Sequence, residues 1–199
     1  MPDNMFLPPS KLQPLITKRE SLLKANGEIL AVSVETRKSA LVHQATEIIW
    51  ASCDSISVLP YDSKRETVLL VRQARAAPLL ADNAVILEAC AGGIEDSDDD
   101  IEAAVHREAM EEMGCKLNSL VKIATVYINP ARMKERAHLF LAGYTQGSAR
   151  AEIRQQDEDE NIEIIELPLK QLQQIYKNGE IQCPRLMMLY QALQLRLSS

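Results

Sequence analysis

The sequence predicts a mixed α/β or α+β domain in which helices cover a β-sheet. Three observations support this prediction: segments rich in β-branched residues recur along the chain, a helical pattern interrupts them near the middle, and two more helical patterns close the chain. The chain has 199 residues, of which 46% are hydrophobic and 25% charged. It is therefore long enough to bury a sizeable core, and its composition is that of an ordinary globular protein.

The first half of the chain is predicted to form an irregular arm followed by strands. Residues 1–25 contain four prolines and are expected to be irregular. Strands are expected where β-branched residues alternate or cluster, at 28–37, 41–52, 53–62, 66–75 and 84–93. The third and fourth of these strands are expected to form a hairpin that turns at residues 60–64.

The second half is predicted to contain three strands and three helices. An acidic turn leads into a helix from about Asp100 to Met113, which Gly114 ends. Strands are expected at 119–128, 137–146 and 161–168, with the loop 129–136 between the first two and a polar stretch, 146–160, before the third. The closing helices are expected at 169–177 and 184–197, because Pro184 suits a first helical turn.

Negative charge is concentrated in one segment. Residues 93–114 contain nine acidic residues and one arginine, whereas the rest of the chain contains 19 acidic and 21 basic residues. Because no basic stripe is present, we expect no nucleic-acid partner. No window approaches the roughly 20 apolar residues of a membrane span, so no membrane is expected either.

The cysteines and the first residues of the sequence predict a cytoplasmic protein. Residues 1–20 lack the basic region, apolar run and small-residue cleavage site of a secretory signal. The four cysteines (Cys53, Cys90, Cys115 and Cys183) are far apart and form no Cys-x-x-Cys pair. Reduced thiols fit this pattern better than a zinc site or a redox motif does.

The acidic helix has an unusual distribution of charge. On a helical wheel, Val105, Glu108 and Glu112 fall within about 40° of Ile101, so the two glutamates continue the apolar face. Two partly buried carboxylates of like charge are costly unless they are neutralised. A hard divalent cation such as Mg²⁺, which prefers oxygen ligands, would neutralise them.

Two other interpretations of this segment were weighed. The acidic residues could form a solvated face, as most charge runs do. The run 95–100 could also be a calcium loop, but it lacks the central glycine and the ligand spacing of an EF-hand. The paired glycines Gly92 and Gly93 favour the metal site, because backbone carbonyls there can approach an ion without a Cβ in the way. Arg107 could hold the carboxylates in place or reach a phosphate.

The same segment resembles the Nudix box, whose family pattern is Gly-x5-Glu-x7-Arg-Glu-U-x-Glu-Glu-x-Gly-U, where U is aliphatic. Matching residues at the required spacing are Gly93, Arg107, Glu108, Glu111, Glu112 and Gly114. Asp99 stands in place of the first glutamate, and Cys115 stands where an aliphatic residue is usual.

Outside the box, residues 45–197 resemble the ADP-ribose and GDP-mannose pyrophosphatase branch of the family. The resemblance is carried by VLLVRQAR, LEACAGG, YINPARMKER and the segment from DENIEI to GEIQ. It implies a Nudix α/β/α sandwich with a mixed sheet at 49–199. It also implies an N-terminal β-rich arm at 1–48 that serves dimerisation and is exchanged across a homodimer.

The resemblance implies an enzyme that hydrolyses the diphosphate bridge of a nucleoside diphosphate sugar to a nucleoside monophosphate and a sugar phosphate. The implied cofactor is Mg²⁺, with Mn²⁺ as an alternative. Its ligands would be Glu108, Glu112, Glu160 and the backbone carbonyl of Ala91. Glu111 and Arg107 would assist catalysis beside the metal, Glu111 as a further ligand or as an acceptor behind the ligands.

The remaining roles come from residues outside the box. Matching the stretch DEDENIEI to the branch makes Glu158 the general base. Arg75 matches a phosphate-contacting arginine, and Glu88 and Glu135 are further candidates for substrate contact. Exposed charge is the alternative for these residues. Two alternative functions stay open: a non-catalytic sensor of nucleotide sugars, and a Nudix pyrophosphatase for another nucleoside diphosphate derivative.

Overall fold

The computed structural model describes residues 12–38, 41–145 and 162–198 of the chain. These residues form two compact units. The N-terminal unit contains the described residues up to Ser52 together with Asn129–Glu135. The second unit, here called the main unit, contains Cys53–Ile128 and the described residues from Arg136 onward. Within the described residues, no helix is both long and apolar enough to cross a membrane.

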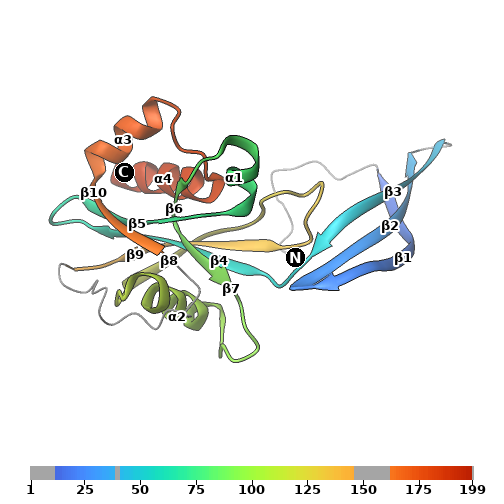
Figure 1. The fold of residues 1–199 in the computed structure, drawn as a ribbon, viewed down its shortest axis with the longest axis horizontal. Helices are drawn as coiled ribbons and strands as arrows, with labels where there is room; N and C mark the ends of the chain where they lie inside the picture. Colours follow the sequence, from blue (N-terminus) through green and yellow to red (C-terminus); the bar gives the residue numbers. More distant parts are fainter. Residues whose placement is uncertain (1–11, 39–40, 146–161, 199) are drawn as a thin grey trace. The chain divides into compact units, whose positions relative to one another are not determined.

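The N-terminal unit is built on a three-stranded antiparallel sheet in the order β1-β2-β3 (Figure 1). The strands are β1 (Gln13–Ala25), β2 (Gly27–Lys38) and β3 (Leu41–Ala51). A tight turn joins β1 to β2 at Gly27, whose φ of +130° favours glycine. A Cβ at Gly27 would also overlap the indole ring of Trp50, so this position combines a special backbone conformation with close packing.

The prediction that residues 1–25 are irregular is wrong for β1. This strand pairs with β2 from Gln13 opposite Arg37 to Ala25 opposite Gly27, with two irregularities in register. Pro14 is tolerated because β1 is an edge strand, where a missing backbone N–H need not break the sheet. The pairing partner of β1, rather than its own sequence pattern, therefore decides its conformation.

The main unit contains a mixed sheet of seven described strands. Five of them follow the order β10-β5-β4-β9-β8. They are β4 (Ser55–Asp62), β5 (Thr67–Gln73), β8 (Asn118–Tyr127), β9 (Arg136–Gly143) and β10 (Ile162–Pro168). Strands β4 and β9 run parallel, and the other neighbours on this path are antiparallel. The predicted mixed sheet and its strands are confirmed.

Two short strands occupy the space where β4 and β5 diverge. Strands β4 and β5 pair only next to their hairpin turn, at Tyr61 and Asp62. Beyond that point β6 (Ile86–Glu88) pairs with β5, and β7 (Cys90–Gly93) pairs with β4. The predicted strand at 84–93 is thus divided at Ala89, and its second half presents the two glycines to the helix that packs on it.

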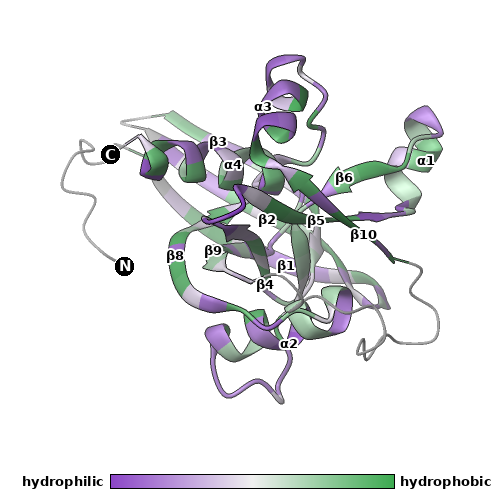
Figure 2. Ribbon diagram, turned by 90° about the vertical axis from the view of Figure 1, so that its left-hand side faces the viewer, coloured by the Kyte–Doolittle hydropathy of each residue, from purple (hydrophilic) through white to green (hydrophobic). Residues whose placement is uncertain are grey.

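Helices cover both faces of the main sheet (Figure 1). Helix α2 (Ile101–Met113) lies on one face, and α3 (Leu169–Lys177) and α4 (Pro184–Leu197) lie on the other. All three helices were predicted. Figure 2 shows β5 and β6 as largely hydrophobic ribbons between these layers.

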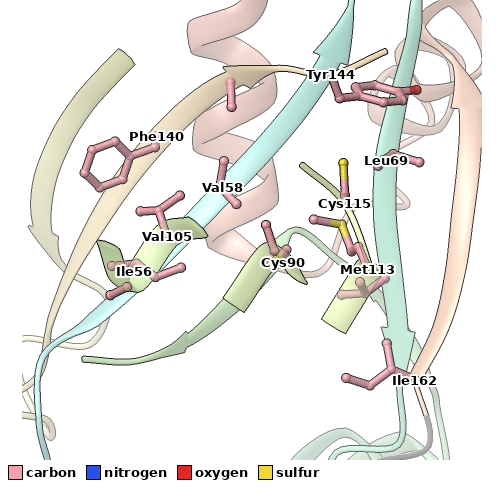
Figure 3. Close-up of a cluster of buried hydrophobic side chains, with 14 residues drawn as sticks. Ile56, Val58, Leu69, Cys90, Val105, Met113, Cys115, Phe140, Tyr144 and Ile162 are labelled. Atoms are coloured by element: carbon pink, nitrogen blue, oxygen red, sulfur yellow. The ribbon is translucent and has the colours of Figure 1, made fainter. Parts of the chain in front are cut away.

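The alternation of side chains along the strands creates a separate core on each face. Residues of the α2-side core include Ile56, Val58, Leu69, Val71 and Phe140 (Figure 3). The intervening residues face α3 and α4 and include Leu59, Val68, Leu70 and Leu139. The central strands β4, β5 and β9 contribute apolar side chains to the cores on both faces of the sheet. This explains why their sequences are almost continuously hydrophobic.

One helix was not predicted. Helix α1 (Ala76–Asp82) follows β5 directly and has no buried residue. A helix without a buried face has no reason to carry an apolar repeat, which is the pattern by which helices are recognised in a sequence.

Candidate active site

Helix α2 begins and ends at residues suited to those positions. The Asp100 carboxylate accepts a hydrogen bond from the backbone N–H of Ala103 at 2.8 Å, which caps the first turn. Gly114 follows the last turn with a φ of +56°, and its N–H donates to the helix carbonyls. These two ends confirm the predicted helix and hold its glutamates in a defined orientation.

The face of α2 that packs on the sheet includes two glutamates. Its buried residues are Ala104, Val105, Glu108, Ala109, Glu112 and Met113. Glu108 is 9% exposed and Glu112 is 4% exposed. The alternative of a solvated acidic face is therefore wrong for these two residues, and the wheel prediction is confirmed.

The backbone of β7 lies directly against these carboxylates. The N–H of Ala91 donates to Glu112 Oε2 at 3.2 Å. A Cβ built on Gly92 would overlap the carboxylate of Glu108, so only glycine leaves the space that this side chain occupies. On the neighbouring strand β4, the hydroxyl of buried Ser57 donates a hydrogen bond to the carbonyl of Cys90 at 3.1 Å, which stabilises β7.

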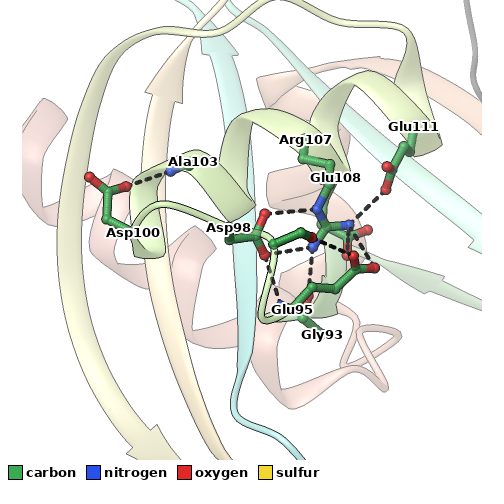
Figure 4. A network of polar contacts seen from close by, with 9 residues as sticks. Gly93, Glu95, Asp98, Asp100, Ala103, Arg107, Glu108 and Glu111 are labelled. Carbon is green, nitrogen blue, oxygen red and sulfur yellow. Dashed lines mark hydrogen bonds and ion pairs between the residues drawn. The ribbon is translucent and has the colours of Figure 1, made fainter.

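Arg107 connects the acidic loop to the helix (Figure 4). Its Nε and Nη2 donate to the two carboxylate oxygens of Asp98 at 2.9 and 3.0 Å, and Nη2 also donates to the carbonyl of Gly93 at 2.8 Å. Its Nη1 donates to Glu108 Oε1 at 2.9 Å and to Glu111 Oε2 at 2.8 Å. These contacts support the first of the two roles predicted for Arg107, which is to hold carboxylates in place.

The protonation of these groups reflects their surroundings. Burial raises the pKa of Glu112 to about 7, and the nearby charge of Glu108 acts in the same direction. Burial also raises the pKa of the Cys90 thiol beneath Glu112. In the loop, the hydrogen bonds from Arg107 lower the pKa of the Asp98 carboxyl. The hydrogen bonds from Arg107 thus favour the charged form of Asp98, whereas burial disfavours the charged form of Glu112.

Arg75 and Glu88 lie at the same end of the sheet as the buried glutamates. Arg75 follows β5, and its Nε donates to Glu88 Oε2 at 3.1 Å. Its positive charge also opposes the rise in the pKa of Glu112, so the guanidinium is within electrostatic reach of that carboxylate. The structure therefore brings these two predicted substrate-contacting residues together with the acidic helix.

Three other predicted residues are not among the contacts described above. Glu158, the predicted base, and Glu160, a predicted metal ligand, lie outside the described residues. Glu135 belongs to the N-terminal unit. There the backbone of its loop bonds to β3, with Trp50 N–H donating to Arg132 O at 2.7 Å and Lys134 N–H donating to Trp50 O at 2.9 Å. The roles of these three residues stay predictions.

The carboxylate oxygens that α2 places against β7 are ligands of the kind that a hard divalent cation prefers. Among the described residues they are too few to complete its coordination. Among residues 12–38, 41–145 and 162–198, no group of three or more His, Cys, Asp or Glu is placed to hold a metal ion. Two buried carboxylates of like charge, one with a raised pKa, nevertheless form a site that a cation would stabilise. The other predicted ligands, the backbone carbonyl of Ala91 and Glu160, stay predictions.

Sequence reasoning missed the contribution of Asp98. Its side chain is only 4% exposed and makes the two hydrogen bonds to Arg107 described above. Within a run of acidic residues, composition alone does not show which carboxylate turns toward the arginine.

Comparisons with known proteins place these features in context. A family model described as the NUDIX domain matches residues 52–184. The chain is 34% identical over 163 residues to GDP-mannose pyrophosphatase of Cronobacter sakazakii, covering 81% of this chain and 84% of that protein. It is 33% identical over 162 residues to GDP-mannose pyrophosphatase of Escherichia coli O1:K1 / APEC, covering 80% and 83%. A crystal structure of an ADP compounds hydrolase shares the fold, with a TM-score of 0.73, 16% identity and coverage of 96% of this chain and 97% of that one.

The close approach of Gly92 to Glu108 predicts that Gly92→Ala disturbs the site. The added methyl group overlaps the Glu108 carboxylate, which must leave its position beside Arg107. We expect the affinity for Mn²⁺, measured by calorimetry, to fall roughly 10-fold or more. Gly93→Ala is the matched control, because its Cβ would meet only the movable Cys53 side chain at 3.1 Å. Equal affinities in wild type and Gly92→Ala would contradict this account.

The raised pKa of Glu112 predicts a pH-dependent stability of the metal-free protein. Between the unfolded value of about 4.3 and the folded value of about 7, the folded state binds more protons, so raising the pH across this range destabilises it. The expected loss is about 4 kcal/mol, from roughly 1.4 kcal/mol per pKa unit.

This prediction is tested by urea denaturation in EDTA from pH 4.5 to 8. Glu112→Gln should become more stable relative to wild type as the pH rises, because the amide carries no charge to bury. Glu102→Gln, on the exposed first turn of the same helix, should show no such trend. A difference between Glu112→Gln and wild type that does not change with pH would exclude a raised pKa.

Proposed function

This chain belongs to the Nudix hydrolase family and has its α/β fold, and we propose that it hydrolyses the diphosphate bridge of nucleoside diphosphate sugars of the GDP-mannose or ADP-ribose type. The observation that carries the proposal is the pair of buried carboxylates, Glu108 and Glu112, packed against the glycine backbone of β7. The relatives named GDP-mannose pyrophosphatase support the choice of substrate class.

The reaction is a hydrolysis of a P–O–P bridge. Water adds to one phosphorus, the bond from that phosphorus to the bridging oxygen breaks, and the bridging oxygen leaves with the other phosphate. The products are a nucleoside monophosphate and a sugar phosphate, and a proton is released at neutral pH. Because the substrate is highly anionic, the site must neutralise charge as well as activate water.

Nudix hydrolases generally use divalent cations such as Mg²⁺. In this chain Glu108, Glu112, Glu160 and the carbonyl of Ala91 would hold the metal, with Mn²⁺ as an alternative. The bound cation supplies neutralisation of the diphosphate and activation of water. The buried pair on α2 supports this assignment, because its own negative charge is incompletely compensated by protein groups.

Protein groups around this pair would bind and orient the substrate. The Arg75 guanidinium, held by Glu88, would contact a phosphate through its planar donors. Arg107 would keep Glu108 and Glu111 in their positions, with Glu111 behind the metal ligands. Glu158 would take the proton of the attacking water, and Glu135 would be a further substrate contact.

The central test is the substitution Glu112→Gln, assayed with GDP-mannose, ADP-ribose and UDP-glucose in the presence of Mg²⁺. Phosphate released by a coupled phosphatase reports cleavage, because the phosphatase acts on the products and not on the diphosphate bridge. We expect turnover to fall about 100-fold or more, since removing a metal ligand forfeits several kcal/mol of charge stabilisation. The thermal midpoint should stay at or above that of wild type.

Glu102→Gln is the control and should keep wild-type turnover, because Glu102 is exposed on the same helix. Full activity of Glu112→Gln would show that the metal assignment is wrong. A wild-type protein that binds nucleotide sugars but cleaves none of them would favour the alternative of a non-catalytic sensor. Cleavage of a different nucleoside diphosphate derivative alone would favour a Nudix pyrophosphatase with another substrate.

We also propose that the chain forms a homodimer through the N-terminal unit and acts in the cytoplasm. Large apolar side chains are exposed on its strands: Leu15, Ile16, Leu22, Leu23, Leu41, Val42 and Ile48. Large apolar side chains exposed in such number on one small sheet are often covered by a partner. The cysteines, all four free and three of them buried, support a reducing compartment.

Light scattering tests the dimer. The expected mass is about twice the 22.2 kDa of one chain. Ile16→Glu should reduce the mass toward that of one chain, because Ile16 is 66% exposed in a single chain and a charge there costs little unless a partner covers it. A wild-type mass equal to one chain at micromolar concentration would remove the dimer proposal.

A further inference from the structure

The acidic loop before α2 ends in three consecutive aspartates, and their contacts in the structure differ from those that the family pattern assigns. Matched from Arg107 backward, the pattern places Asp99 at the position of the first glutamate. In the structure, however, the carboxylate that turns toward Arg107 is that of Asp98. We infer that Asp98, and not Asp99, is the residue that positions Arg107 for catalysis, an inference that rests on the proposed function.

Asp98 and Asp99 differ in their contacts, because only the Asp98 side chain is hydrogen-bonded to other described residues. Both oxygens of Asp98 accept hydrogen bonds from the Arg107 guanidinium, and Oδ2 also accepts one from the backbone N–H of Glu95 at 2.8 Å. Asp99 is exposed, and its side chain makes no hydrogen bond or ion pair with any residue in the described ranges. Asp100, the next residue, caps α2. Asp99 is thus a spacer between two aspartates that have structural partners.

The glycines support the same reassignment. Five residues separate Gly92 from Asp98, which is the spacing that the pattern requires between its glycine and its first acid. Gly92 is also the glycine whose missing side chain leaves space for Glu108, whereas a Cβ on Gly93 would meet only Cys53. Counted from Gly92, the spacing selects Asp98, whereas counted from Gly93 it selects Asp99. The hydrogen bonds to Arg107 decide between them in favour of Asp98.

The identity of this aspartate matters because Arg107 is shared between two sets of acceptors. On the loop side it is held by Asp98 and the Gly93 carbonyl, and on the helix side Nη1 contacts Glu108 and Glu111. A bidentate carboxylate fixes the plane of a guanidinium as well as its position. Without that anchor the guanidinium can move toward the glutamates and compete with a cation for their oxygens. Asp98 therefore acts on metal binding and turnover rather than on recognition of the base or sugar.

Four variants test this inference: Asp98→Asn, Asp98→Glu, Asp99→Asn and Asp96→Asn. Asp96 is an exposed neighbour and controls for the loss of one negative charge in the loop. For Asp98→Asn we expect kcat for the best nucleotide sugar to fall roughly 10- to 100-fold, with KM within about two-fold of wild type. Asp99→Asn and Asp96→Asn should keep kcat within about two-fold of wild type.

A second measurement does not depend on turnover. The electron paramagnetic resonance signal of free Mn²⁺, titrated with protein in the absence of substrate, should show affinity lowered roughly 10-fold in Asp98→Asn and unchanged in Asp99→Asn. Asp98→Glu restores the charge and should recover part of both kcat and Mn²⁺ affinity. If Asp98→Asn does not fold, the same comparison is made between Asp98→Glu and Asp99→Asn, and Asp98→Glu must then be the more impaired.

The outcomes separate this inference from the proposed function. A wild-type enzyme that cleaves no nucleotide sugar refutes the function, while Mn²⁺ affinities still decide which aspartate matters. An active wild type with unchanged kcat and Mn²⁺ affinity in Asp98→Asn overturns the inference alone. A loss in Asp99→Asn equal to or larger than that in Asp98→Asn also overturns it and restores the assignment made from the sequence pattern.

Discussion

The burial of two carboxylates of like charge between α2 and β7 is the constraint on which the site depends. Glu108 and Glu112 lie on the face of the helix that elsewhere carries Val105, Ala109 and Met113. Removing two negative charges from water costs several kcal/mol unless other groups compensate. Arg107 compensates Glu108, and the Ala91 amide contributes a hydrogen bond to Glu112, but the raised pKa of Glu112 shows that the compensation is partial. The pair therefore carries negative charge that the surrounding described groups compensate only in part.

The divergence of β4 and β5 provides the surface on which this burial occurs. Because the two strands pair only beside their turn, a separate segment can cross from one to the other as β6 and β7. This segment carries Glu88 toward Arg75 at one end and Gly92 toward Glu108 at the other. The apolar cores above and below the sheet hold the helix and the strand at a fixed spacing. The position of the buried carboxylate pair therefore depends on an irregularity of the sheet that hydrophobic packing on both faces stabilises.

The boundary between the two units does not follow the chain order. The loop Asn129–Glu135 connects β8 and β9 of the main sheet, yet its backbone is bonded to Trp50 at the end of β3. Where the chain returns to the main unit, Arg136 pairs with Asp54 through its backbone N–H and its guanidinium. A loop that the family resemblance assigns to substrate contact thus belongs structurally to the unit proposed to dimerise.

The sequence by itself determined the main strands, the ends of α2, and the inward turn of Glu108 and Glu112, because periodicity and capping residues are local properties of the chain. Its motif spacing was also specific enough to identify the family. Only the tertiary structure decided that residues 13–25 form a strand, since their conformation comes from pairing with β2. It likewise decided which aspartate of an acidic run faces Arg107, and which of two adjacent glycines makes room for Glu108. Those choices depend on how the loop lies against the helix, which neither the composition nor the spacing of the motif specifies.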